Sequence, residues 1–385
     1  MDKILLGDLC LPASKNIKLA STDLIDYVDI SSVDNQAKFI TGYTTYEYQD
    51  APSRARKSVS IGDVIISTVR PNLNAVAVFD ITTPNTPVVS TGFCVLSCRD
   101  DVNPRYVYYA CQSREFIRQL VSQATGASYP AVNDKIIRNA LIPNYTLSSQ
   151  NFICDQLDSV QNLINIKKKE NKIFNETIKA RFVEMFGDII RNNKGWPQYV
   201  FSDIATSRLG KMLDAKQQTG KYKYPYLANF NVQWFRFELE NLNEMDFNEA
   251  DQVEFQLNDG DLLVCEGGEI GRCAVWHNEI QPCYFQKALH RVRCNTDVVL
   301  PDYLARWFQY NCEHGGFASI EGAKATIAHL PGAKLKMLKA TVPPIELQER
   351  FVSFVAQVDK SKSVNDRIID RLQRTKASLM QEYFG

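Results

Sequence analysis

The chain has 385 residues, of which 45% are hydrophobic and 23% charged, and 44 Lys and Arg residues balance 44 Asp and Glu residues. This composition excludes an intrinsically disordered chain, and the zero net charge argues against a protein that simply coats nucleic acid. No apolar run of about 18 residues occurs, and the start lacks the apolar core of a signal peptide. We therefore expect a cytoplasmic protein of about two domains with connecting segments.

Ten cysteines are scattered along the chain without a CxxC pair. This spacing favours reduced thiols, buried as small hydrophobic side chains, over a disulfide framework or a zinc site. His277 lies in sequence among Cys265, Cys273 and Cys283, but without the paired spacing of zinc ligands. The expectation is that the chain binds no metal.

Charge is distributed unevenly along the sequence. Arg54, Arg56, Lys57 and Arg70 fall close together, whereas residues 238–261 contain nine acidic residues and no Lys or Arg. Segregated charge permits one face for a polyanion and another for a basic partner or solvent.

Short elements of the first half recur about 198 positions later. A buried strand predicted at 64–66 follows the turn at Gly62, and its counterpart at 262–264 follows Gly260 (260 − 62 = 198). Further short apolar segments at 76–79 and 273–276 correspond in the same way. The two halves are therefore predicted to be duplicated and mainly β.

Two helices and two loops extend the correspondence. Pro104 and Pro301 begin apolar-rich stretches that predict helices reaching Leu120 and Phe317 (301 − 104 = 197). Polar loops led by glycine follow at 126–132 and 322–328, and a short strand ends each half near Pro143 and Pro343.

Each half ends in a long stretch with apolar residues at steps of three and four, which is typical of an amphipathic helix. The predicted helices cover 148–187 and 345–385, and at 1.5 Å per residue each would be roughly 60 Å long. Their predicted apolar seam consists of Ile153, Leu157, Val160, Ile164, Phe174, Ile178, Val355, Val358, Ile369, Leu372 and Leu379. The seams favour pairing of the two helices, and the alternative is that each helix packs on its own domain.

The expected fold class is α+β. It consists of two tandem, mainly β domains joined by two long coiled-coil helices, paired antiparallel with pseudo-twofold symmetry. The expected boundaries are 1–147 for the first domain, 148–187 for the first helix, 188–196 for a linker, 197–344 for the second domain and 345–385 for the second helix. Such symmetry suits two spaced half-sites on a duplex.

Catalytic motifs are missing from the sequence. Gly210-Lys211 and Gly220-Lys221 lack the remaining residues of a phosphate-binding GxxxxGK[ST] loop, and neither GxSxG nor HExxH occurs. The segment at 103–106 comes close to the Asn-Pro-Pro-Tyr loop of adenine methyltransferases, but its repeat partner at 300–303 favours a helix start instead. We expect no catalytic residues.

The whole chain resembles the specificity subunit of a type I restriction-modification system. The resemblance rests on the helix endings at 181–188 and 378–385, on the segment 343–348 that leads into the second helix, and on 300–304. The first half departs from the family's Pro-Pro pattern, because it has Pro143-Asn144-Tyr145. The order of these motifs, repeated around two long helices, is specific to that family.

The resemblance implies a non-catalytic subunit whose two target-recognition domains each read one half of an asymmetric bipartite DNA sequence. It implies that the helices set the gap between the halves and dock two methyltransferase subunits, with two motor-nuclease subunits completing the complex. It also implies that S-adenosylmethionine, ATP and Mg are bound by those partner subunits and that this chain binds no cofactor.

DNA reading requires Arg, Lys, hydroxyl and amide groups on loops. In the first half the candidates are Tyr43, Thr44, Arg54, Arg56, Lys57, Arg70, Asn72, Ser128 and Tyr129. In the second half they are Lys211, Lys221, Tyr222, Lys223, Arg272, Lys287, Arg291, Lys324 and His329. The glycine-led loops are favoured, so Lys324→Ala is predicted to weaken binding to the second half-site.

Three alternatives remain open at the level of sequence. The chain could serve a type II-like restriction-modification enzyme as its recognition subunit. It could be a self-contained DNA-modifying enzyme with diverged motifs, in which case the purified chain alone would transfer methyl groups. It could also be an adaptor whose helices bind partners without reading DNA.

Overall fold

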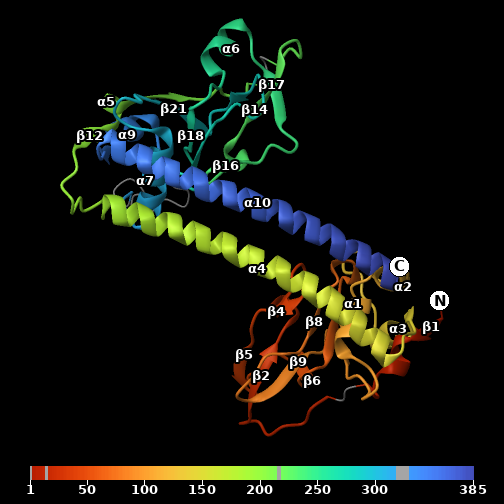
Figure 1. Cartoon of the computed structure of the whole chain (residues 1–385). Helices are drawn as coiled ribbons and strands as arrows, with labels where there is room; N and C mark the ends of the chain where they lie inside the picture. The colour runs from red at the N-terminus through yellow and green to blue at the C-terminus, as the bar shows by residue number, and fades with distance from the viewer. Residues whose placement is uncertain (1, 14–15, 215–217, 318–328) are drawn as a thin grey trace. The chain divides into compact units, whose positions relative to one another are not determined.

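The computed structural model describes residues 2–13, 16–214, 218–317 and 329–385 (Figure 1). They form two compact units, of which unit 1 comprises Met1–Lys169 with Asn365–Gly385 and unit 2 comprises Glu170–Val364. Two helices of 40 residues each, α4 (Leu147–Phe186) and α10 (Ile345–Phe384), contribute to both units.

Unit 1 combines short strands with three short α-helices. Its strands are β1 (Lys3–Leu5), β2 (Leu24–Val28), β3 (Val33–Asp34), β4 (Phe39–Ile40), β5 (Thr44–Glu47), β6 (Ala55–Ser58), β7 (Val64–Ser67), β8 (Val76–Val78), β9 (Thr86–Ser90), β10 (Phe93–Leu96) and β11 (Leu141–Pro143). Its helices are η1 (Leu6–Leu9), η2 (Ile30–Ser32), η3 (Pro71–Leu73), α1 (Pro104–Ala110), α2 (Arg114–Gln123) and α3 (Asp134–Arg138).

Unit 2 repeats this order with local differences. Its strands are β12 (Gln198–Val200), β13 (Ala205–Leu209), β14 (Lys223–Leu227), β15 (Val232–Gln233), β16 (Arg236–Phe237), β17 (Asn243–Asp246), β18 (Leu262–Cys265), β19 (Cys273–Val275), β20 (Tyr284–Phe285), β21 (Leu289–Cys294) and β22 (Lys339–Thr341). Its helices are α5 (Phe201–Ile204), η5 (Asn229–Asn231), α6 (Glu249–Phe255), α7 (Pro301–Glu313) and α9 (Gly332–Met337).

The sheets of the two units share a topology. In unit 1 a four-stranded sheet has the order β5-β2-β9-β6 and a three-stranded sheet the order β10-β7-β8. In unit 2 the corresponding sheets run β17-β14-β20 and β13-β21-β18-β19. The β2–β9 pair and the β14–β20 pair are both parallel, whereas the other strand pairs are antiparallel. A parallel pair at the same place in both units is what a duplication produces.

Matching hydrogen bonds hold equivalent parts of the two units. The Gln150 side chain accepts from the amide of Asn103 at 2.9 Å, and the Gln348 side chain accepts from the amide of Leu300 at 2.9 Å. Both glutamines lie near the start of a long helix and both are almost completely buried. Because a buried amide without a partner costs about 1–3 kcal/mol, each glutamine fixes its helix against the loop before α1 or α7.

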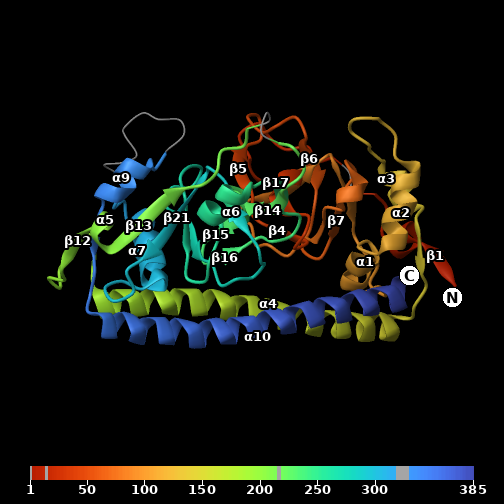
Figure 2. The same cartoon turned by 90° about the horizontal axis from the view of Figure 1, so that it is seen from above.

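The long helices pair within each unit, and they also pack on its domain (Figures 1 and 2). In unit 1, Ile153 and Leu157 of α4 share a core with Leu379 of α10 and with α1. In unit 2, Ile178 of α4 shares a core with Val355 of α10 and with α7. In both units the start of one helix lies beside the end of the other. The two helices therefore run antiparallel there.

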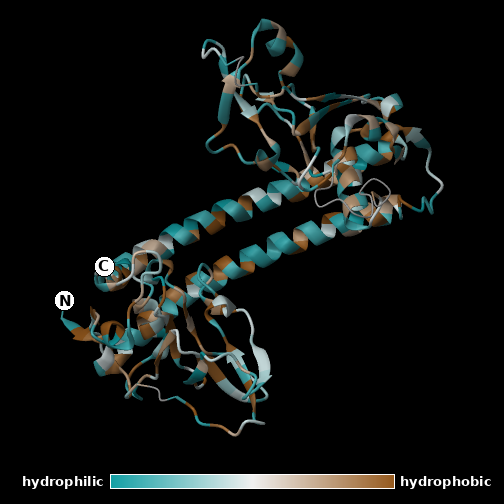
Figure 3. Cartoon of the chain, turned by 180° about the vertical axis from the view of Figure 1, so that it is seen from behind, coloured by the Kyte–Doolittle hydropathy of each residue, from teal (hydrophilic) through white to brown (hydrophobic). Residues whose placement is uncertain are grey.

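Both packing alternatives drawn from the sequence therefore occur together. All of the seam residues named above are buried or half-buried, and Figure 3 shows apolar residues recurring among polar ones along both helices. A 40-residue helix is stable in water mainly because such a face is covered. The predicted fold class, α+β with two mainly β domains and two long helices, is confirmed.

Two element predictions were wrong in detail. The stretch from Pro104 to Leu120 is not one helix, because α1 ends at Ala110 and Ser113 caps α2 by accepting from the amide of Phe116 at 3.1 Å. In the second half α7 ends at Glu313, ahead of Gly315, whose φ of +74° terminates helical geometry.

Candidate nucleic-acid interface

In unit 1, backbone hydrogen bonds bring three polar loops side by side. The carbonyl of Arg54 accepts from the amide of Thr91 at 2.8 Å, and the carbonyl of Gly92 accepts from the amide of Thr68 at 2.8 Å. The amide of Arg70 in turn donates to the carbonyl of Pro130 at 2.7 Å. The candidates that this arrangement gathers on neighbouring loops are Arg54, Arg70, Asn72, Ser128 and Tyr129.

Arg70 and Tyr129 form an exposed cation–aromatic pair. The guanidinium carbon lies 4.7 Å from the centre of the Tyr129 ring, and 68% of Tyr129 is exposed. Arg70 has a φ of +51°, a left-handed conformation that is uncommon for residues other than glycine and is concentrated at functional sites. A planar cation held on an aromatic ring can donate to phosphate or to a base edge, or stack on a base.

Tyr43 and Thr44 lie at the β5 edge of the four-stranded sheet β5-β2-β9-β6, near Tyr27 of β2. Arg54 precedes β6, at the other edge of this sheet. Thr44 pairs with Tyr27 across β5 and β2, and both Tyr43 and Thr44 are exposed. Burial raises the pKa of the Tyr27 phenol, although its contact with Ser90 and the nearby charge of Arg54 oppose that rise. Tyr27 itself is 5% exposed, so it supports the sheet beneath the two candidates.

Two candidate cations of unit 1 are used for internal contacts. The Lys57 ammonium donates to Asp134 and to the carbonyl of Phe93, both at 2.6 Å, and only 11% of its side chain is exposed. The Arg56 guanidinium donates to the carbonyl of Ala55 at 2.7 Å and covers the Tyr48 ring at 4.6 Å. These contacts give both residues a structural role on β6.

Three candidate cations of unit 2 likewise use their charges for contacts within the fold. Lys211 is 9% exposed, and its ammonium donates to the Asp246 carbonyl at 2.6 Å and to Asp251 at 2.5 Å. Arg291, also 9% exposed, donates to two backbone carbonyls of the α6 region at 2.8 and 3.0 Å. Arg272 pairs with Glu269 at 3.0 Å, and 17% of its side chain is exposed.

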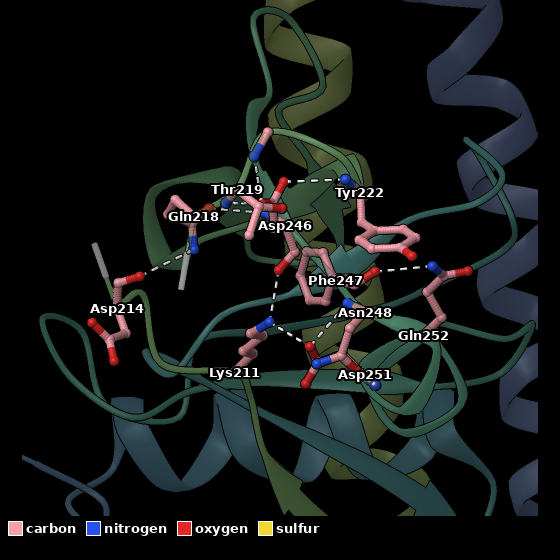
Figure 4. A network of polar contacts seen from close by, with 11 residues as sticks. Lys211, Asp214, Gln218, Thr219, Tyr222, Asp246, Phe247, Asn248, Asp251 and Gln252 are labelled. Atoms are coloured by element: carbon pink, nitrogen blue, oxygen red, sulfur yellow. Dashed lines mark hydrogen bonds and ion pairs between the residues drawn. The ribbon is translucent and has the colours of Figure 1, made fainter. Parts of the chain in front are cut away.

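Lys221 and Tyr222 lie on an exposed turn, and the exposed Lys223 begins β14. Asp246 organises this turn through contacts with Thr219 and Tyr222 (Figure 4). The Asp246 carboxylate accepts from the backbone amide of Thr219, from its hydroxyl at 2.8 Å, and from the amides of Gly220 at 2.6 Å and Tyr222 at 3.3 Å. Burial raises the pKa of Asp246, but these hydrogen bonds outweigh it and hold the pKa below its ordinary value. The charged carboxylate thus holds the turn in one conformation.

Lys287 and His329 lie on either side of the segment Glu266–Gly267 in unit 2. His329 forms an isolated antiparallel bridge with Gly267, and the amide of Glu266 donates to the carbonyl of Ala288, next to Lys287, at 3.0 Å. Both candidate side chains are exposed. Lys324 lies outside the described residues, so the predicted effect of Lys324→Ala stays a prediction.

The two units present different residues on one framework. Val69 bridges Ala131 in unit 1, and Gly267 bridges His329 in unit 2 (267 − 69 = 198 and 329 − 131 = 198). The amide that follows each bridge donates to an equivalent carbonyl, from Val132 to Thr68 at 2.9 Å and from Leu330 to Glu266 at 2.7 Å. The backbone is thus repeated at these positions while the side chains that it presents differ.

A cavity of about 1300 Å³ in unit 1 collects a further group of cations. The ammonium of Lys376 on α10 donates to the Gln161 side chain at 2.7 Å, and the ammonium of Lys38 donates to the carbonyl and side-chain oxygens of Asn74 at 2.5 and 3.0 Å. Burial lowers the pKa of Lys38 to about 8; Asp34 opposes this, and the positive charge of Lys376 adds to it.

The lowered pKa of Lys38 predicts a pH dependence of stability. Between about 8 and its ordinary value of 10.5, the folded state binds fewer protons at Lys38 than the unfolded state does. The free energy of unfolding is therefore expected to rise with pH across this window, and Lys38→Met should remove that rise. Urea unfolding at pH 7.5, 9 and 10 measures the free energy of unfolding of the original chain and of Lys38→Met. An equal rise of this free energy with pH in both proteins would contradict the assignment to Lys38.

The described residues form neither a metal-binding cluster nor a membrane-spanning helix. Residues 2–13, 16–214, 218–317 and 329–385 contain no group of three or more His, Cys, Asp or Glu side chains placed to hold a metal ion. Within these ranges, no helix combines the length and the apolar character that a membrane crossing requires.

The family model described as type I restriction modification DNA specificity domain matches residues 193–374. Over these residues the chain is similar to type I restriction-modification specificity subunits. The resemblance inferred from the sequence is thereby confirmed.

A curated relative supports the assignment over part of its length. The provisionally named type I restriction enzyme MjaX specificity subunit of Methanocaldococcus jannaschii is 22% identical over 176 residues. The match covers 45% of this chain and spans only 41% of that relative.

Two solved structures share the fold over nearly the whole chain. One, from work on complex assembly and conformational transition of the type I R-M system, has a TM-score of 0.59 at 21% identity and covers 99% of this chain and 97% of its own. The other, the S subunit of a type I restriction-modification system from M. genitalium, has a TM-score of 0.58 at 12% identity and covers 100% and 96%. At these identities the likeness shows the fold.

Proposed function

We propose that the chain is the sequence-reading subunit of a type I restriction-modification complex. Unit 1 reads one half of an asymmetric bipartite DNA target, and unit 2 reads the other half. The two long helices set the gap between the halves and dock two methyltransferase subunits. Two motor-nuclease subunits complete the complex, and the chain itself contributes no catalytic residue.

The repeated framework with different side chains is the observation that carries this proposal. The bridges Val69–Ala131 and Gly267–His329 are equivalent, yet one supports Arg70 and Tyr129 and the other supports Lys287 and His329. Base pairs are distinguished by the donors and acceptors that contact their edges, so loops with different polar side chains read different sequences. A duplicated domain with exchanged loop residues therefore suits two unlike half-sites.

In unit 1, the reading surface consists of the exposed candidates Tyr43, Thr44, Arg54, Arg70, Asn72, Ser128 and Tyr129. In unit 2, it consists of Lys221, Tyr222, Lys223, Lys287 and His329. The cations Lys57, Lys211 and Arg291 are given a supporting role, because their charges are already used within the fold.

Arg70→Ala should weaken binding of the target duplex by the reconstituted complex about 10- to 100-fold, the range for one lost base or phosphate contact. A phosphate contact would also lower the salt dependence of binding by about one counterion. Arg118→Ala is the matched control, because Arg118 is exposed in the same unit but pairs with Glu115 on α2 at 2.8 Å. Equal affinities of the two variants would contradict the role of Arg70.

Sequencing of genomic DNA with N6-methyladenine detection, in cells with and without this gene, tests the proposed function. The expected result is loss of one bipartite methylated motif on deletion. Exchange of residues 1–147 for those of another family member should then change only one half of that motif. An unchanged methylation pattern in cells that express active partner subunits would contradict the proposal.

A further inference from the structure

Cys10 and Cys98 of unit 1 face each other across two antiparallel chain segments. They form an isolated antiparallel bridge, flanked by a hydrogen bond from the Leu11 amide to the Ser97 carbonyl at 2.8 Å and another from the Arg99 amide to the Leu9 carbonyl at 3.1 Å. This is the pattern of a non-hydrogen-bonded pair, in which side chains come closest and the Cα atoms are about 4.5 Å apart. That separation lies within the roughly 4.4–6.8 Å that a disulfide spans.

The two thiol groups also influence each other electrostatically. Each thiol shifts the pKa of the other, as expected for side chains on facing positions of a non-hydrogen-bonded pair. Cys10 is 8% exposed and Cys98 is half-buried. All ten cysteines of the chain are free thiols in this structure.

The two thiols have opposite pKa shifts, because their contact raises the pKa of Cys98 and lowers that of Cys10, which makes Cys10 the attacking thiolate. The contact with Cys98 lowers the pKa of Cys10; burial opposes this, and the Arg138 guanidinium lowers the pKa further. Arg138 donates one hydrogen bond, at 2.9 Å, to the carbonyl of Leu11. Its buried Nε and Nη2 atoms have no hydrogen-bond partner in the described part of the chain, so their charge is available to a thiolate.

From this geometry we propose that Cys10 and Cys98 form a cross-strand dithiol, a modification site that a small disulfide such as oxidised glutathione converts to a Cys10–Cys98 disulfide. One thiolate attacks the glutathione disulfide and releases the first glutathione thiolate. The second thiolate then displaces the other glutathione from the mixed disulfide. The two cysteines lose two electrons and two protons, and two molecules of reduced glutathione form.

The second half of the chain supplies an internal control. Ala205 and Cys294 form the equivalent pair on β13 and β21, with the Asn295 amide donating to the Ile204 carbonyl at 2.8 Å (205 − 10 = 195 and 294 − 98 = 196). Since alanine replaces one cysteine there, unit 2 has the backbone of the site without its chemistry.

The bond would close a loop around the reading sheets of unit 1. The segment between Cys10 and Cys98 contains every strand from β2 to β10 and carries Arg54 and Arg70. Cross-linking residues so far apart in sequence removes conformational freedom mainly from the unfolded chain. Oxidation is thus expected to raise the thermal midpoint of unit 1 by about 5–10 °C.

The test incubates the purified full chain with a tenfold excess of oxidised over reduced glutathione. Titratable thiols should fall from ten to eight (10 − 2 = 8), the intact mass should drop by two hydrogens, and non-reducing peptide mapping should recover Cys10 joined to Cys98. Dithiothreitol should restore all ten thiols. Continued full reduction, or a disulfide mapped to Cys94 or Cys111, would overturn the proposal.

Variants separate this pair from general thiol oxidation. Cys98→Ser and Cys10→Ser should each abolish the mass change, whereas Cys294→Ser should leave it intact. Ala205→Cys should add a second disulfide, to Cys294, because it recreates the same pair in unit 2. Loss of the mass change in Cys294→Ser, or its persistence in folded Cys98→Ser, would contradict the assignment.

Discussion

Replacing Phe384 with alanine is expected to destabilise unit 1 by about 3–5 kcal/mol, the usual cost of removing a buried aromatic ring. Phe384 is 2% exposed, and its ring lies 5.4 Å from that of Tyr106 on α1. The same core contains Ile153 and Leu157 of α4. The last turn of α10 therefore completes a core whose other residues come mainly from the first 157 positions of the chain. A cavity at this point would loosen both helix ends together.

Hydrogen–deuterium exchange read on peptides of unit 1 is the direct measurement for Phe384→Ala. Protection should fall around Tyr106 and Ile153 and remain unchanged around Tyr303 in unit 2. Ile368→Ala is the matched control, because Ile368 lies on the same helix but is 37% exposed and should cost about 1 kcal/mol or less. Unchanged protection at Tyr106 would show that this core does not depend on the helix end.

Lys211→Ala is expected to cost unit 2 about 3 kcal/mol, because it leaves Asp251 charged and partly buried without its partner. The side chains of Lys211 and Asp251 are 10% and 18% exposed, and the Lys211 ammonium lies 5.2 Å from the centre of the Phe247 ring. Asp251 also forms the capping box of α6 with Asn248. Loss of the ion pair should therefore loosen α6 and the turn that carries Lys221 (Figure 4).

Urea unfolding of Lys211→Ala, Asp251→Asn and the double variant measures the coupling between the two side chains. The double variant should cost clearly less than the two single variants together, because the second change removes the charge that the first left unpaired. Lys221→Ala is the control, since Lys221 is exposed on the adjacent turn and should change stability by less than about 0.5 kcal/mol. Additive costs would contradict a coupled buried pair.

The interface was only partly predictable from the sequence. Residue type and loop position identified Arg70 and Tyr129 as candidates, but nothing in the spacing of 70 and 129 indicates that their side chains meet at 4.7 Å. Residue type also selected Lys57, Lys211 and Arg291, whose charges the fold uses internally. A lysine that binds a ligand and a lysine that pairs with a buried carboxylate look alike until the partner's place in space is known.

The sequence by itself determined the duplication, the mainly β halves and the two long helices. Those features follow from local periodicity and from residues repeated about 198 positions apart, and both can be read directly from the sequence. Only the tertiary structure decided that Phe186 completes the core of unit 2 and Phe384 that of unit 1. Only the tertiary structure showed that Cys10 faces Cys98, and that Ala205 and Cys294 form the equivalent pair in unit 2. The physical reason is that burial, ion pairing and thiol contact depend on neighbours distant in sequence, which local pattern does not encode.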